Sequence, residues 1–245
     1  MKKNTDALQY SAVILVFTLL VGLALAFTVD EPRYDLILSG GNLLAKSFVS
    51  TIVISLVTLA GTLVLGFVMF VMLRSKITVI RATASVFSEI IMGTPLLVMI
   101  FLVVYPLGQV LGSNNKLFLG ILAMIFYNSP YVANAYESTA AVVTADQYTV
   151  MDLYGFKWYQ KYCYVILPQM IKPFIPSLVN NLSSVIKGSA LLNVIAVGEI
   201  TYMTTVVSNR NYAVIEGYYV MWLMYLTVTI PLSLLAKYIG KKVGS

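Results

Sequence analysis

The sequence predicts an all-α polytopic membrane protein with about six transmembrane helices. Hydrophobic residues make up 59% of the 245 residues and charged residues only 11%. Soluble domains average about 45–50% apolar and about 25% charged residues, so this chain is not a soluble domain. Its apolar runs are long and continuous. Because backbone groups in lipid must form their hydrogen bonds within the segment, such runs predict helices rather than a barrel.

Six apolar segments are expected to span the bilayer, at residues 11–28, 47–73, 89–111, 117–135, 173–207 and 218–236. The first segment exceeds the usual signal-peptide core of about 7–15 residues, which favours a retained anchor. The A-x-A pattern at 24–26 leaves a cleaved signal peptide as the open alternative. The segment 173–207 is too long for one straight crossing of about 30 Å. We therefore expect a break near Gly188, with Glu199 near the external surface.

Basic residues alternate between the two sides of the predicted spans, as the positive-inside rule requires. One side collects eleven of the sixteen: Lys2, Lys3, Arg74, Lys76, Arg81, Lys157, Lys161, Lys172, Lys237, Lys241 and Lys242. This distribution predicts that both termini and the polar loop at 136–172 are cytoplasmic. The net charge of +6 then needs no nucleic acid to explain it.

Several motifs occur in a fixed order. They are EIIMGTPLL at 89–97, NSPY at 128–131, Gly155 followed by ILP at 166–168, KGSAL at 187–191 and VGE at 197–199. In this order they resemble the permease subunits of bacterial polar-amino-acid ABC importers, the binding-protein-dependent inner membrane components of histidine, glutamine, arginine or cystine type. The resemblance covers roughly residues 47–240. It implies a five-helix permease core at 47–240, preceded at 1–46 by one additional helix and an external connection of residues 29–46.

The resemblance implies the membrane-spanning subunit of an ATP-driven importer in the bacterial inner membrane, with a pathway for a polar amino acid. Its expected partners are ABC ATPase subunits, a second permease subunit, an extracellular substrate-binding protein and lipid. The chain has no G-x-x-x-x-G-K-[ST] motif, no histidine and one cysteine. We therefore expect no enzyme activity, no metal site and no bound cofactor, with ATP and Mg held by the partner ATPase.

The loop at 136–172 is the expected site of coupling to the ATPase. A short helix from Val150 to Tyr154, ended by Gly155, is expected to transmit force, while Phe156, Trp158 and Tyr159 pack against the ATPase or the membrane surface. Asp152 and Lys157 would orient this contact. The coupling residues are Thr149, Val150, Met151, Asp152, Gly155, Phe156 and Lys157.

Polar residues within the spans are candidates for the translocation pathway, because such groups usually face a cavity or a partner. They are Asn128, Ser129, Tyr131, Asn134, Lys187 and Glu199. Asn128, Tyr131 and Asn134 are expected near one helix face. Hydrogen bonds within the bundle, or a helix cap in the case of Glu199, explain these residues equally well. Gating or packing roles are assigned to Gly93, Thr94, Pro95 and Gly188, with Gly93 supplying a backbone geometry that other residues cannot adopt.

The chain departs from the family pattern at several positions. Met92 replaces an arginine, Asn134 a common glutamate and Gly188 an aspartate, while Thr149, Val150 and Met151 stand where the family has Glu-Ala-Ala. The departures leave the transported amino acid open. They also favour a heterodimer, since one altered coupling loop is tolerable beside an intact one. An ion-coupled secondary transporter remains the alternative function.

Overall fold

The computed structural model describes residues 33–243 and, before them, residues 16, 19, 20, 22, 23 and 27. The predicted first span at 11–28, with the question of its cleavage, falls almost wholly outside this part. Residues 33–243 form helices and turns without any strand, as the sequence predicts. The protein is therefore all-α over the whole described core.

The helices follow one another along the chain with short connections. In order they are α2 (Tyr34–Leu38), α3 (Gly41–Leu73), α4 (Thr78–Met92), α5 (Leu96–Leu102), the π-helix η1 (Val103–Leu107), α6 (Gly108–Val110), α7 (Lys116–Ala140), α8 (Ala145–Leu153), α9 (Trp158–Gln160), the π-helix η2 (Lys161–Ile166), α10 (Leu167–Ser189), the 3₁₀ helix η3 (Ala190–Ile195), α11 (Ile200–Arg210) and α12 (Val214–Val243).

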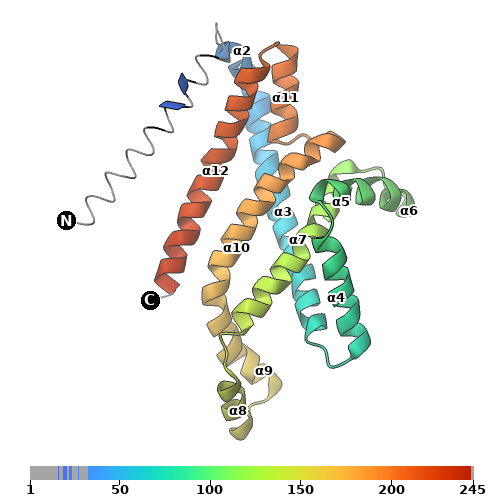
Figure 1. Cartoon of the computed structure of the whole chain (residues 1–245), viewed down its shortest axis with the longest axis vertical. Helices are drawn as coiled ribbons and strands as arrows, with labels where there is room; N and C mark the ends of the chain where they lie inside the picture. The colour runs from blue at the N-terminus through green and yellow to red at the C-terminus, as the bar shows by residue number, and fades with distance from the viewer. Residues whose placement is uncertain (1–15, 17–18, 21, 24–26, 28–32, 244–245) are drawn as a thin grey trace, which may run out of the picture.

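Three of these helices, α3, α7 and α12, are long and apolar enough to cross a membrane alone. Two bent pairs qualify as further spans if each pair is counted as one crossing. Within residues 33–243 this gives up to five spans, in the positions of the last five predicted segments. The long helices run together along the molecule, and α8 and α9 lie at one end of it (Figure 1).

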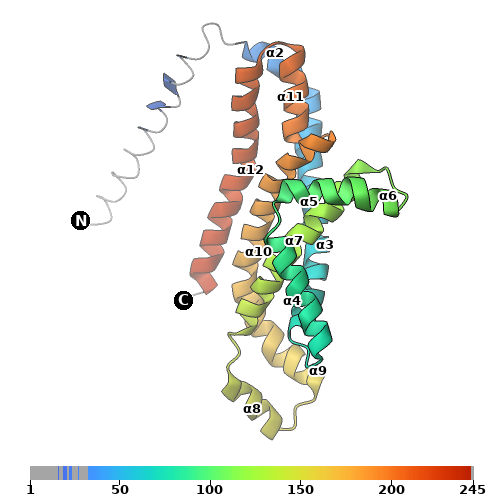
Figure 2. The same cartoon turned by 45° about the vertical axis from the view of Figure 1, so that its right-hand side comes forward.

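The predicted span at 89–111 is wrong in its limits and shape. The helical segment starts at Thr78 rather than Glu89, and its two parts, Thr78–Met92 and Leu96–Val110, meet at an angle of 112°. Figure 2 shows α5 and α6 lying across the direction of α4. Pro95 explains the break, because proline has no N–H to donate and disfavours helical geometry in the residue before it.

The predicted break in the fifth span is confirmed. Regular α-helix ends at Ser189, one residue after Gly188, and a 3₁₀ segment leads to Ala196, which has a left-handed φ of 61°. After this break α11 continues at 50° to the preceding helix. The break separates Lys187 from Glu199 and places them in different helices.

Close packing of α3 on α7 depends on small residues. A Cβ atom added to Gly66 would lie 2.9 Å from Cγ1 of Val132 and 3.1 Å from the carbonyl oxygen of Ser129, and one added to Gly61 would overlap Ile125. These two glycines therefore allow the close contact between α3 and α7. Such contacts replace the hydrophobic driving force that is missing between helices in lipid.

The described part of the predicted connection, residues 33–46, is largely helical. Residues 34–38 form α2, and α3 begins at Gly41, six residues before its predicted start. The backbone N–H of Arg33 donates to Oε1 of Glu216 at 3.0 Å, and Nδ2 of Asn211 donates to the carbonyl oxygen of Leu36 at 3.0 Å. These bonds fasten the connection to α11 and α12.

Candidate functional site

The predicted coupling helix exists as α8, but it is longer than expected. It starts at Ala145 instead of Val150, because Thr144 is extended and acts as the N-cap. Its end is as predicted, since Gly155 follows with a left-handed φ of 65°. The N–H of Gly155 donates to the carbonyl oxygen of Asp152, and that of Phe156 donates to Met151. This pair of bonds is a Schellman motif, which closes the helix on a glycine.

One side of α8 holds the helix in place and the other faces outward. Met151 is 4% exposed and packs with Ala140, Ile166 and Met170, whereas Val150 is 49% exposed. The other proposed coupling residues, Thr149, Asp152, Gly155, Phe156 and Lys157, are also exposed. The structure thus presents six of the seven at the surface and uses Met151 as an anchor.

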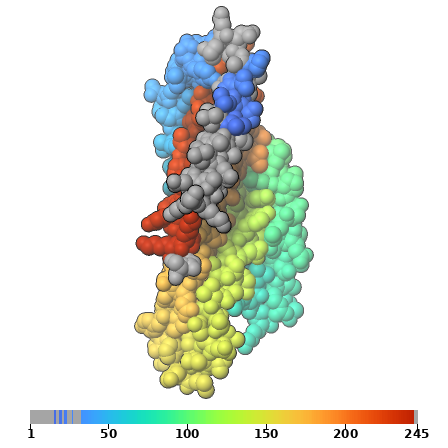
Figure 3. Space-filling view, turned by 60° about the vertical axis from the view of Figure 1, so that its left-hand side comes forward, coloured from blue at the N-terminus to red at the C-terminus, as the bar shows by residue number. Residues whose placement is uncertain are grey.

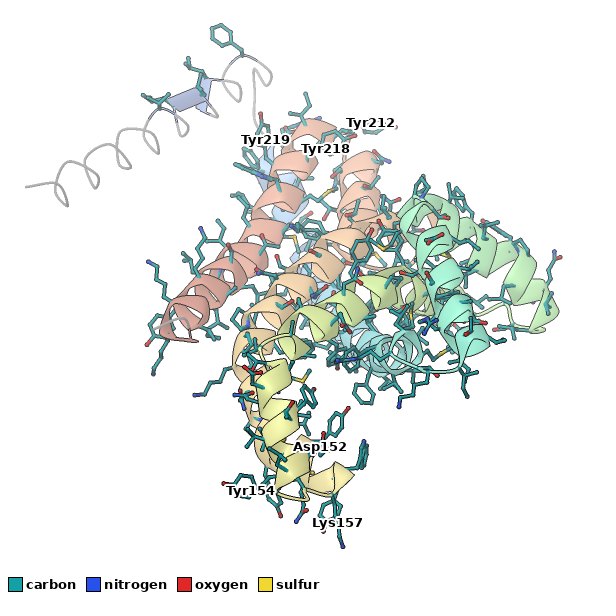
Figure 4. The ribbon with its side chains drawn as sticks, turned by 60° about the horizontal axis from the view of Figure 1, so that its bottom comes forward. Asp152, Tyr154, Lys157, Tyr212, Tyr218 and Tyr219 are labelled. Atoms are coloured by element: carbon teal, nitrogen blue, oxygen red, sulfur yellow. The ribbon has the colours of Figure 1, made fainter. Side chains whose placement is uncertain are left out.

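Sequence reasoning missed the two most exposed apolar side chains of the loop. Leu153 and Tyr154 are 80% and 79% exposed. Tyr154 points away from the molecule at its lower end (Figure 4), and the loop projects beyond the bundle in the space-filling view (Figure 3). Their position directly before the terminating glycine was the available signal. Exposed apolar side chains at such a tip are typical of a binding surface.

An ion pair braces the outer end of the loop. Lys161 Nζ pairs with Asp152 Oδ1, and the N–H of Lys157 donates to Oε1 of Gln160 at 2.8 Å. The Asp152–Lys161 pair connects α8 to η2 across the turn at Gly155. Since exposed ion pairs contribute only about 0–1 kcal/mol, it fixes the loop's shape more than its stability. Asp152 therefore has a partner inside this chain that the sequence did not reveal.

The α7 candidates are divided between two environments. Asn128 and Ser129 are buried and donate to carbonyl oxygens of their own helix, to Met124 at 2.7 Å and to Phe126 at 2.8 Å. Tyr131 and Asn134 are exposed. The predicted common face of Asn128, Tyr131 and Asn134 is thus buried at Asn128 and exposed at the other two residues, because each step of three residues falls about 60° short of a full helical turn.

Lys187 lies in a polar cavity of about 370 Å³ between α10 and α12. The cavity is lined by Asn180, Ser183, Ser184, Lys187, Thr229, Ile230 and Ser233. The four α10 residues are spaced i, i+3, i+4 and i+7, so they form one polar face on a helix that belongs to a span. Sequence reasoning found only the lysine, although this spacing was readable. None of the other predicted pathway residues lines this cavity.

Glu199 is fully buried and serves as the N-cap of α11. Its carboxylate accepts hydrogen bonds from the N–H groups of Thr201 at 2.9 Å and Tyr202 at 2.7 Å, and from the hydroxyl of Tyr225 at 2.8 Å. The position of Glu199 near the external membrane surface stays a prediction, and its side chain is enclosed by the bundle. Its contacts are those of the capping alternative, and they join α11 to α12.

The segment Gly93-Thr94-Pro95 lies at the 112° bend rather than at the start of a span. Gly93 has φ −80° and ψ −9°, which any residue can adopt, so the expected special backbone geometry is wrong. A Cβ there would lie 3.2 Å from the carbonyl oxygen of Glu89. A Cβ on Gly188 would lie 3.2 Å from Cδ2 of Leu96, just after the bend. Gly188 thus lets α10 approach α5 closely.

A bundle of apolar spans, a polar cavity among them and a self-contained loop projecting from one end together define a membrane-embedded transport subunit. The family model described as "Binding-protein-dependent transport system inner membrane component" matches residues 62–245. The chain belongs to this family, whose members are the permease subunits of ABC transporters.

Individual proteins with similar sequences are also named as ABC transporter permeases. The chain is 30% identical to the "Probable glutamine ABC transporter permease protein GlnM" of Bacillus subtilis (strain 168) over 80% of this chain and 90% of that protein. It is 27% identical to the "Inner membrane amino-acid ABC transporter permease protein YhdY" of Escherichia coli (strain K12), covering 78% of this chain and 54% of YhdY.

Solved structures share the fold. A chain of the "Crystal structure of an amino acid ABC transporter with histidines" superposes with a TM-score of 0.76 and 25% identity, over 84% of this chain and 96% of that one. A chain of the inward-facing "MetNI methionine ABC transporter" superposes with a TM-score of 0.70, over 84% of this chain and 98% of that one. The latter is 14% identical and supports the fold alone.

Proposed function

We propose that this chain forms, together with a second permease subunit, the translocation pathway for a polar amino acid in the bacterial cytoplasmic membrane. The relatives whose names specify glutamine or amino acids support this substrate class. We assign the end that carries α8, and both termini, to the cytoplasm, on the basis of the basic-residue distribution. The opposite end, with α11 and the start of α12, is then available to an extracellular binding protein.

The observation that carries the substrate proposal is the polar face of α10 around Lys187. A charged side chain within a span is costly in lipid and usually faces a water-filled cavity or a partner. The Lys187 cation attracts the carboxylate group that all amino acids share. The neighbouring serine, threonine and asparagine groups supply hydrogen bonds in place of water. Asn128, Ser129, Tyr131 and Asn134 on α7 belong to the same proposed pathway through the adjacent helix.

In this proposal, ATP hydrolysis by the separate ATPase drives transport, and α8 is the contact through which the ATPase moves the spans. A separate ATPase binds ATP and Mg, while this chain binds no cofactor and transmits the ATPase's movement to the spans. The bends at Gly93–Pro95 and after Gly188 are the proposed points of flexure, since helix axes already change direction there.

The test is uptake by proteoliposomes that contain this chain with its co-purified partners and its binding protein. Lys187→Gln is expected to lower amino-acid uptake roughly tenfold or more, because a charge-assisted hydrogen bond is worth about 1.5–3 kcal/mol. Lys237→Gln, the same change on the exposed part of α12, is expected to leave uptake unchanged. Uptake driven by an ion gradient without any ATPase would instead establish a secondary transporter, and full uptake by Lys187→Gln would remove Lys187 from the pathway.

A further inference from the structure

A second groove lies beside the loop, where α3 ends and α10 begins. Its volume is about 770 Å³, and its walls come from the end of α3, the start of α4, α8, α9, η2 and the start of α10. Apart from Arg74 and Ser75, the lining consists of apolar, aromatic or sulfur-containing side chains. The groove therefore combines a large apolar surface with one cation.

The cation is held without an anionic partner. Arg74 is the C-cap residue of α3, and its guanidinium carbon lies 5.3 Å from the centre of the Phe70 ring. Among residues 33–243, no carboxylate lies within ion-pair distance of Arg74; the ion pair found there joins Lys161 to Asp152. Lys76 and Arg81 are exposed nearby in sequence and add positive charge. An anion bound at Arg74 would meet no repulsion from a carboxylate on this rim.

Aromatic side chains mark the depth of the groove in the membrane. Trp158, Tyr159 and Tyr162 line it, and the Trp158 and Tyr162 rings lie 5.2 Å apart. Tryptophan and tyrosine are enriched where hydrocarbon meets the headgroup layer, because their rings are amphipathic. Arg74 directly follows the last residue of the apolar helix α3 and so belongs at the same level. Both features are those expected at the boundary between the acyl chains and the headgroups.

We propose that this groove binds an anionic phospholipid from the leaflet on the α8 side. The acyl chain lies against Phe67, Val71 and Leu167, and the phosphate pairs with Arg74. Basic pockets between membrane helices on this side are suited to anionic headgroups. Of the aromatic residues expected to pack against the ATPase or the membrane surface, Trp158 and Tyr159 line the groove, whereas Phe156 and the exposed tip residues Leu153 and Tyr154 lie outside it. The proposal assigns the groove to the lipid and the tip to the ATPase. The proposal does not depend on the transported substrate.

The two tryptophans of the chain, Trp158 and Trp222, allow a direct test. Trp222→Phe leaves Trp158 as the reporter, and the full-length protein is placed in phosphatidylcholine nanodiscs that contain a minor share of brominated lipid. Brominated phosphatidylglycerol is expected to quench Trp158 more than brominated phosphatidylcholine at the same share. Trp158→Phe leaves Trp222 on α12, which is expected to show no headgroup preference.

Arg74→Gln is expected to reduce the preference of Trp158 for phosphatidylglycerol about fivefold, the effect of one basic residue at an anionic surface. Lys172→Gln, an equal charge change on the exposed side of α10, is expected to retain the preference. Equal quenching by the two lipids, or a preference unchanged by Arg74→Gln, would overturn the proposal. Loss of the quenching when the ATPase is added would also overturn it, because the ATPase would then occupy the groove. All outcomes are read without measuring transport, so they are independent of the proposed function.

Discussion

The turn that ends α8 depends on the left-handed backbone conformation of Gly155. Its φ of 65° is one that a β-branched residue adopts only with strain, at a cost of about 1–2 kcal/mol. We expect Gly155→Val to distort the Schellman closure and to uncouple ATP hydrolysis from uptake, while the spans stay folded. The measurement is the ratio of amino acid taken up to ATP hydrolysed in proteoliposomes.

Gly155→Asn is the matched control, because asparagine tolerates the left-handed region at helix ends. Its coupling ratio is expected to stay near that of the unchanged protein. Normal coupling in Gly155→Val would mean that the loop does not transmit force through this turn.

Glu199 is a residue whose removal leaves several buried donors without a partner. Glu199→Ala deletes the acceptor for Thr201 N–H, Tyr202 N–H and the Tyr225 hydroxyl. We expect a loss of about 2–3 kcal/mol in the free energy of unfolding, since the lost cap costs about 1–2 kcal/mol and the lost bond to Tyr225 about 1 kcal/mol; the Tyr225 hydroxyl keeps Thr201 Oγ1 as a partner. Denaturant unfolding in detergent micelles provides the measurement.

Tyr225→Phe removes the bonds that the hydroxyl makes with Glu199 and with Thr201 Oγ1 but keeps the cap of α11, and it is expected to cost about 1 kcal/mol. An equal loss in both variants would show that the capping of α11 contributes nothing measurable.

At the scale of helices, the α3–α7 contact is sensitive to a single methyl group. Gly66→Ala would place its Cβ 3.1 Å from the Ser129 carbonyl oxygen, which belongs to backbone and cannot swing aside. We expect a loss of about 1–3 kcal/mol, the usual cost of overpacking. Thermal unfolding of the purified protein measures it. Gly41→Ala is the control, since no atom lies within 4 Å of the added Cβ; if both variants unfold alike, the close contact is not what holds the helices.

Helix positions were predictable where a long, continuous run of apolar residues marks a membrane span. The apolar runs gave α3, α7 and α12, and the excess length of 173–207 gave the break after Gly188. The α4–α5 bend was missed because the run 89–111 is equally apolar on both sides of it, so hydropathy carries no information on direction. The polar face of α10 was not predicted, because Lys187 is its one ionisable residue and the asparagine and serines beside it carry no charge. The Asp152–Lys161 pair depends on the turn between them and has no signal in sequence spacing.

At the scale of the whole molecule, the tip of the loop is the expected contact with the ATPase. A central tyrosine in an interface contributes about 2 kcal/mol or more, while a neighbouring leucine usually contributes less. We therefore expect the double change Leu153→Ala and Tyr154→Ala to weaken ATPase binding at least about thirtyfold. Co-purification and titration of the ATPase measure this affinity. Tyr218→Ala changes a tyrosine that is 60% exposed at the other end of the molecule (Figure 4) and should leave the affinity unchanged. Equal affinity in both variants would place the ATPase elsewhere.

The composition of the permease dimer is a second prediction for the whole molecule. Thr149 stands where the family has glutamate, so the motif lacks its carboxylate. Val150 and Met151 stand where the family has alanine, and Met151 is buried. We expect a second, different permease chain that keeps the acidic motif. Mass spectrometry of the complex purified from native membranes identifies it. A transport-active complex with two copies of this chain and one type of ATPase would contradict the prediction.

The shape of the loop at 136–172 is fixed by three contacts: the glycine turn after α8, the Asp152–Lys161 ion pair and the packing of Met151 against the bundle. Its outer side chains therefore do not support the rest of the bundle, and selection can replace them one at a time without endangering membrane insertion. Substitutions on the outer surface of the loop are therefore expected to alter the choice of ATPase while the helices in the bilayer keep their packing.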